Sequence, residues 1–129
     1  MKYVPSHVHL TTQAVDDWVR FYVDAFDATV MGTMDSFGAR MVNLDVGGLS
    51  IRISNATGVE QAAAGEGAVP VLPPEGYHHF GFLVDDLDAA VGDLVAKGAE
   101  VEVPSTNATP TMRTAFLRLP GGVRVELCQ

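Results

Sequence analysis

The chain carries one order of hydrophobic patterns, and this order occurs twice. In the first half, residues 6–12 and 39–46 alternate apolar and polar side chains, which predicts strands with one apolar and one polar face. A glycine pair at 47–48 predicts a tight turn, after which residues 49–54 return as the partner strand. Between the first two strands, residues 14–26 predict a helix, because they space these apolar side chains at helical intervals: Val15, Trp18, Val19, Tyr22 and Phe26.

The second half repeats the order of the first. Its predicted elements are a strand at 78–84, a helix at 85–98, and strands at 99–103, 113–119 and 123–129. His79 follows His7 by 72 residues and Gly122 follows Gly48 by 74, so we interpret the chain as an internal duplication. We predict an α+β fold of two tandem βαβββ modules, residues 1–54 and 77–129. Residues 55–76, rich in Ala, Gly, Pro and Glu, would link them within one structural domain, with room for one short helical turn.

The polar faces of the predicted strands indicate a binding site. Each helix must cover one face of its sheet, so the apolar positions of the strands point toward it. The opposite face then carries mostly polar side chains: His7, His9, Thr11, Ser50, Arg52, Ser54, His79, Arg124, Glu126 and Cys128. A concave site explains so polar a face better than a hydrophobic core does.

The composition and net charge of the chain argue against several classes of binding partner. The net charge of −8 argues against nucleic acid or an anionic membrane as the main partner. The single cysteine excludes an internal disulfide framework. The first residues lack the apolar core of a signal peptide, and no apolar run approaches the ~18 residues of a membrane span. We therefore expect a cytoplasmic protein.

Several motifs together resemble the vicinal oxygen chelate superfamily, which includes glyoxalase I, methylmalonyl-CoA epimerase, extradiol dioxygenases and bleomycin resistance proteins. Phe21-Tyr22 follows His7 at the family spacing of 14 and 15 positions. His79, Phe82 and Asp86 resemble the family's H-x-x-F-x-V-x-D motif, and LPGGVRVEL resembles its closing motif, with Leu119 where Asp is usual. The resemblance covers nearly the whole chain. It implies a cupped mixed sheet and, commonly, a homodimer.

The resemblance also implies a metal site with one departure from the family pattern. The matching positions are His7, Arg52, His79 and Glu126. Arg52 cannot bind metal because its guanidinium stays protonated and only donates. Glyoxalase I and the epimerases place Glu or Gln there, so glyoxalase activity is in doubt. The remaining two histidines and carboxylate suit a divalent metal, with Fe(II) slightly favoured over Mn, Co, Ni or Zn.

These residues favour a metal-dependent enzyme of the glyoxalase or dioxygenase type, acting on vicinal oxygens of a small organic substrate. Extradiol dioxygenases, however, place tyrosine where this chain has Phe116, so their full constellation is missing. The alternative function is metal-free binding of a small molecule, as in antibiotic-sequestering resistance proteins. We expect substrate specificity to reside in a loop at 31–40, in the linker and in a loop at 104–113.

Four polar residues outside the main ligand set need separate interpretation. His9 is a candidate catalytic residue; it could instead be an ordinary strand histidine, or replace His7 as a ligand. Arg52, also a catalytic candidate, would neutralise an anionic group of the substrate or pair with Glu126 in place of the metal. We predict that His78 is a surface or capping residue and that Cys128 is a bystander near the chain end.

Overall fold

The computed structural model describes residues 1–36, 39–64 and 72–129, which fall into two compact units. The first unit is His7–His78, and the second unit combines Met1–Ser6 with His79–Gln129. The elements follow the order β1 α1 β2 β3 β4, then α2, then β5 α3 β6 β7 β8. This order confirms the predicted α+β class and the two βαβββ modules. None of the helices in the described ranges is long and apolar enough to cross a membrane.

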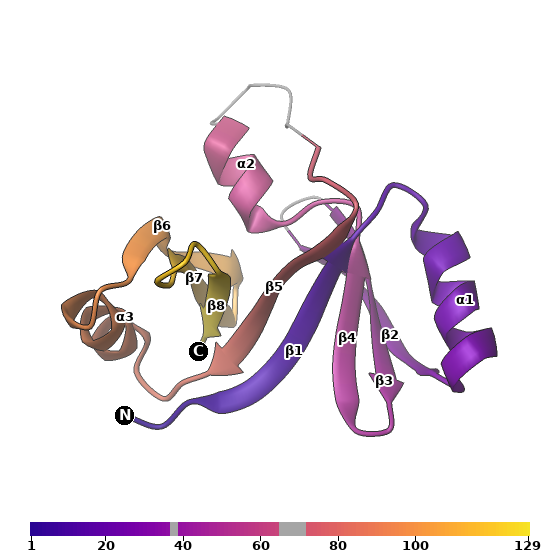
Figure 1. The fold of residues 1–129 in the computed structure, drawn as a ribbon, viewed down its shortest axis with the longest axis horizontal. Helices are drawn as coiled ribbons and strands as arrows, with labels where there is room; N and C mark the ends of the chain where they lie inside the picture. Colours follow the sequence, from indigo (N-terminus) through magenta and orange to yellow (C-terminus); the bar gives the residue numbers. More distant parts are fainter. Residues whose placement is uncertain (37–38, 65–71) are drawn as a thin grey trace. The chain divides into compact units, whose positions relative to one another are not determined.

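The first unit places one helix against four strands in the order β2-β3-β4-β1 (Figure 1). The elements are β1 (Val4–Thr11, from His7 onward in this unit), α1 (Val15–Phe26), β2 (Thr29–Ser36), β3 (Ala39–Val46), β4 (Leu49–Ser54) and α2 (Gly58–Ala64). β1 pairs with β4 in parallel, and the other two pairs are antiparallel. The alternating residues Ile51 and Ile53 are buried because they meet the apolar side of α1, as the pattern predicts. Phe26, at the last residue of α1, instead stays 54% exposed.

One loop prediction in this part of the chain needs correction. Residues 31–36 of the predicted 31–40 loop belong to β2, which pairs with β3 from Thr29 to Ser36. Phe37 lies outside the described residues, as do residues 65–71 of the predicted linker. Residues 58–64 of that linker form the short helix α2, in agreement with the helical turn allowed there, and its first residues Gly58, Val59 and Glu60 are buried.

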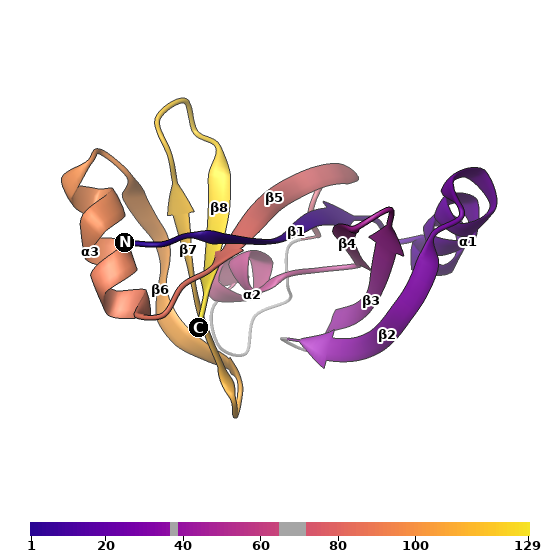
Figure 2. The ribbon, with the colours of Figure 1, turned by 90° about the horizontal axis from the view of Figure 1, so that it is seen from below.

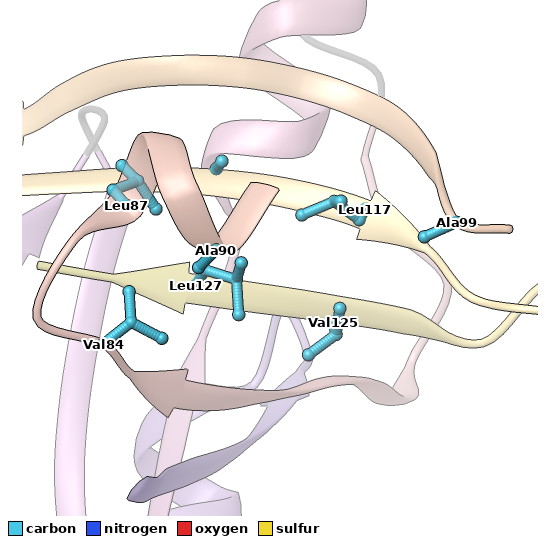
Figure 3. Close-up of a cluster of buried hydrophobic side chains, with 8 residues drawn as sticks. Val84, Leu87, Ala90, Ala99, Leu117, Val125 and Leu127 are labelled. Carbon is cyan, nitrogen blue, oxygen red and sulfur yellow. The ribbon is translucent and has the colours of Figure 1, made fainter. Parts of the chain in front are cut away.

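The second unit repeats the arrangement with the strand order β5-β8-β7-β6. Its elements are β5 (Gly76–Leu83, from His79 onward in this unit), α3 (Leu87–Ala96), β6 (Glu100–Thr109), β7 (Met112–Arg118) and β8 (Arg124–Cys128). Figure 2 shows α3 beside β6, β7 and β8. Its apolar side packs on these strands through fully buried side chains such as Leu87, Leu117 and Leu127 (Figure 3). The Asp86 carboxylate caps α3 by accepting from the Ala89 amide at 3.0 Å.

The predicted loop at 104–113 is also wrong. β6 extends to Thr109 and β7 begins at Met112, so the strands continue through most of that range. β6 contains several register shifts, including one between Val103 and Thr106. Such bulges break the alternation of apolar and polar residues, which is why the sequence pattern predicted the strand at 99–103 but not its extension to Thr109.

Candidate functional site

The polar face of β1 is more buried than its apolar face. His7, His9 and Thr11 are 4%, 3% and 0% exposed, whereas Val8 and Leu10 between them are only partly buried. The rings of His7 and His9 meet edge to face, with centroids 5.9 Å apart. Histidines on a solvated strand face would be exposed, so their burial supports the prediction that this face carries the site.

A short chain of hydrogen bonds orients His9 within the first unit. His9 Nε2 lies 2.7 Å from the Ser54 hydroxyl, and that hydroxyl donates to the Ala56 carbonyl at 3.0 Å. Ser54 ends β4 and is fully buried. The alternating pattern placed Ser54 on the polar face, but its contact with His9 was not predicted.

Arg52 lies in the middle of the same polar face. It is the register partner of His9 on β1 and of Asn43 on β3. Its Nε is buried and has no hydrogen-bond partner among the described residues, and the same holds for the side-chain oxygen Oδ1 of Asn43. A buried donor of this kind is costly unless an acceptor is supplied.

In the second unit, His79 and Glu126 form a buried pair. His79 Nε2 lies 2.8 Å from Glu126 Oε2, and the side chains are 0% and 8% exposed. The Cys128 thiol donates to the other carboxylate oxygen, Oε1, at 3.1 Å. The ring of Phe116 stands perpendicular to that of His79, with centroids 5.1 Å apart. Each oxygen of the Glu126 carboxylate is thus in contact with a side chain of its own unit.

Arg124, on the polar face of β8, belongs to an ion cluster. Its Nε donates to Glu102 Oε1 at 2.6 Å, and Arg118 Nε donates to Glu102 Oε2 at 3.0 Å. Burial alone would raise the pKa of Glu102, but the two arginines outweigh burial and hold that pKa below its ordinary value. Arg124 is therefore committed to a structural pair with Glu102.

The prediction that His78 is a surface or capping residue is wrong. His78 is 8% exposed, and its Nε2 lies 2.8 Å from Glu60 Oε2 in α2. Glu60 also accepts from the Thr57 amide at 2.8 Å, which is a capping box at the start of the helix. Burial would raise the pKa of Glu60, yet the contacts with His78 and Thr57 together lower it. The spacing Thr57-x-x-Glu60 was the sequence signal for this cap.

The donor chemistry of the predicted ligands fits a divalent metal. His7, His9, His79 and Glu126 are all buried, and each offers one imidazole nitrogen or carboxylate oxygen. Nitrogen and carboxylate ligands suit Fe(II), Mn, Co, Ni and Zn. Among the predicted site residues, the structure brings His9 toward Ser54 in the first unit and joins His79 to Glu126 in the second.

Comparison with known proteins identifies the family. Residues 5–127 match the family model described as the Glyoxalase/Bleomycin resistance protein/Dioxygenase superfamily. The chain belongs to this superfamily. The predicted resemblance to the vicinal oxygen chelate proteins is therefore confirmed over nearly the whole chain. A search of curated proteins found no match.

Three solved structures share this fold. A hypothetical protein from Bacillus halodurans has a TM-score of 0.75 at 20% identity, covering 99% of this chain and 94% of that chain. Methylmalonyl-CoA epimerase from Mycobacterium tuberculosis has a TM-score of 0.72 at 20% identity, covering 97% and 86%. A variant of the Streptomyces coelicolor epimerase in complex with 2-nitronate-propionyl-CoA has a TM-score of 0.67 at 24% identity, covering 98% and 97%. At these identities the likeness concerns the fold alone.

Proposed function

We propose that the protein is a divalent-metal enzyme in which His7, His79 and Glu126 supply the metal ligands. The observation that carries the proposal is the contact of His79 with Glu126, 2.8 Å apart and buried on neighbouring strands. Burying a carboxylate and an imidazole costs free energy that apolar residues would not cost. A metal site gives that burial a function, since both groups are ligands of divalent metals.

His7 is the equivalent ligand from the first module. It is the fourth residue of β1, as His79 is the fourth residue of β5. Both side chains are buried. Because the two modules share one order of strands and helices, we expect the same strand position to serve the same purpose in each. The superfamily membership of residues 5–127 supports this assignment.

A bound metal would polarise two neighbouring oxygens of a small organic substrate and stabilise the anion formed from it. Arg52 is proposed to bind an anionic oxygen of that substrate through its buried Nε. His9, on the same face as Arg52 and paired with it in register, is proposed to take up or return a proton of the substrate. Both residues are therefore proposed as catalytic.

Fe(II) remains our first choice of metal, with Mn, Co, Ni and Zn as alternatives. Two histidines and one carboxylate leave several coordination positions open for substrate and oxygen. Arg52 removes the fourth protein ligand that resemblance to glyoxalase I and the epimerases implies. These features favour ring-cleaving or related oxygen chemistry over isomerisation. Consumption of oxygen by the iron-loaded protein with catechol-like compounds would separate the two reaction classes.

The competing proposal is a metal-free binding protein of the antibiotic-sequestering kind. The net charge of −8 would suit a cationic drug. This alternative predicts that cationic antibiotics raise the melting temperature of protein stripped of metal, and that His79→Ala binds them as well as the unaltered protein does. We further propose a cytoplasmic homodimer, which light scattering on the purified protein would test for its oligomeric state.

The metal content of protein purified without oxygen tests the main proposal. We expect about one Fe(II) or other divalent ion per chain, lost in His79→Ala and in Glu126→Ala. His78→Gln is the matched control, because His78 is the adjacent buried histidine and pairs with Glu60. The control should keep its metal. Only trace metal in the unaltered protein, with no change in His79→Ala, would overturn the proposal.

A further inference from the structure

The Ser54 hydroxyl determines which nitrogen of His9 carries hydrogen. A hydroxyl has a single hydrogen to donate. Ser54 Oγ lies 3.0 Å from the Ala56 carbonyl, which can only accept, so that contact uses the Ser54 hydrogen. The second contact of Ser54 Oγ, 2.7 Å from His9 Nε2, must then have nitrogen as the donor. Both hydrogen bonds can form together only if His9 Nε2 carries a hydrogen.

We propose that Ser54 is a positioning residue that holds neutral His9 as the Nε2–H tautomer, so that His9 presents the lone pair of Nδ1. All three partners are part of the first unit, and His9 and Ser54 are 3% and 0% exposed. Water is therefore a poor competitor for either hydrogen bond. The catalytic role of His9 rests on the proposed function, whereas its tautomer rests only on these contacts.

The same segment orients a second histidine. Glu60, six residues after Ser54, faces His78 Nε2 at 2.8 Å, and a carboxylate accepts a hydrogen from that nitrogen. The rings of His9 and His78 lie 6.2 Å apart. Residues 54–60, predicted to be the end of a strand and part of a linker, thus supply partners for two buried imidazoles. Because Glu60 does not contact Ser54 in any described hydrogen bond, His78 provides an internal control.

The consequence concerns how His9 meets a substrate. With Nε2–H committed to Ser54, His9 accepts a hydrogen bond or a proton at Nδ1 rather than donating from Nε2. A substrate hydroxyl or an acidic C–H group would fit this nitrogen, whereas a substrate carbonyl oxygen would not. The partners of Ser54 in these two hydrogen bonds are His9 and Ala56, neither of which is among the three proposed metal ligands.

Nitrogen NMR of the imidazole rings tests the proposal directly. Multiple-bond ¹⁵N–¹H spectra of the metal-free protein, recorded at about pH 8 where ordinary histidines are neutral, distinguish the two tautomers. Signals are assigned with His9→Gln and His78→Gln. We expect the Nε2–H form for His9, a mixture of tautomers in Ser54→Ala, and recovery of the Nε2–H form in Ser54→Thr. His78 should stay Nε2–H in both Ser54 variants.

An Nδ1–H or doubly protonated His9 in the unaltered protein would overturn the proposal, as would an unchanged His9 in folded Ser54→Ala. If Ser54→Ala does not fold, the spectra of the unaltered protein and Ser54→Thr still decide the tautomer. Ser54→Ala should keep the metal content of the unaltered protein. Absence of metal from all variants would contradict the proposed function but leave the tautomer result standing.

Discussion

His79 and Glu126 are 47 residues apart in the sequence, yet His79 Nε2 lies 2.8 Å from Glu126 Oε2 in a buried setting. Their strands, β5 and β8, are parallel neighbours, so the pair is fixed by backbone hydrogen bonds between Phe80–Leu83 and Val125–Cys128. A rigid sheet is a precise support for a metal ligand. The contact therefore brings together two of the three metal ligands that we propose.

Glu126→Gln should separate folding from metal binding. The amide oxygen of glutamine can still accept from His79, so the metal-free protein should fold with little loss of stability. The amide is a much weaker metal ligand than a carboxylate. We expect the affinity for metal to fall by more than the roughly 10–100-fold that follows loss of a supporting hydrogen bond. Competition with a metal-binding dye measures this loss; unaltered affinity in folded Glu126→Gln would remove Glu126 from the ligand set.

The Cys128 thiol should increase the metal affinity of the site through the same carboxylate, although the sequence predicted Cys128 to be a bystander. It donates to Glu126 Oε1 at 3.1 Å, while Oε2 of the same carboxylate lies 2.8 Å from His79 Nε2. Cys128→Ala should weaken metal binding by about 10–100-fold, as is usual when a partner of a ligand is removed. Cys128→Ser keeps a donor and should retain most of the affinity. Equal affinities for the alanine and serine variants would show that the thiol has no such role.

Glu60 should stabilise the fold in a pH-dependent way. Its pKa is lowered because the contacts with His78 and Thr57 outweigh its burial. A lowered carboxyl pKa contributes stability above the unfolded value of about 4.3, and this contribution is lost as pH falls through the folded pKa. We expect Glu60→Gln to lower the free energy of unfolding by about 1–3 kcal/mol at pH 7.

Urea unfolding at pH 7 and at several acidic values measures the effect of Glu60→Gln, and the difference from the unaltered protein should shrink as pH falls below 4. Glu100→Gln is the matched control, because Glu100 is exposed at the start of β6 and should change stability little at any pH. A difference that does not depend on pH would mean that the charge of Glu60 is not what stabilises α2.

Glu102 should contribute more to the free energy of unfolding than an exposed carboxylate does. It is shared by Arg118 and Arg124, and its side chain is 24% exposed. Glu102→Ala removes the acceptor of both arginines, so we expect a loss of about 1–3 kcal/mol in the free energy of unfolding. Asp17→Ala is the comparison, since Asp17 pairs with Arg20 at 77% exposure and should cost no more than about 0.5 kcal/mol. Chemical denaturation that ranks Asp17 above Glu102 would contradict this assignment.

The strands and helices were predictable wherever one face is buried under a helix. Ile51 and Ile53 in β4, and Val125 and Leu127 in β8, are buried as their alternation predicts. β2 was missed because it lies at the end of its strand order and keeps apolar residues exposed, such as Met31 at 66%. A strand at that position lacks the buried face that produces a regular pattern.

The site was predictable at the level of strand faces and not at the level of partners. Alternation alone places Glu126 and Cys128 on one face, because they are two residues apart in β8. It cannot reveal that His78 meets Glu60, since that partner comes from α2 and lies 18 residues away in the sequence. Only the tertiary packing of a helix that the sequence barely indicates brings the two together.

The most direct test of the central proposal is a crystal structure of the protein loaded with the metal that it retains on anaerobic purification. Diffraction data on both sides of the absorption edge of that metal locate it without assumption. We predict one anomalous peak at about 2.0–2.2 Å from an imidazole nitrogen of His7, one of His79 and a carboxylate oxygen of Glu126. No peak at these three residues, in crystals of protein shown to contain the metal, would contradict the proposal.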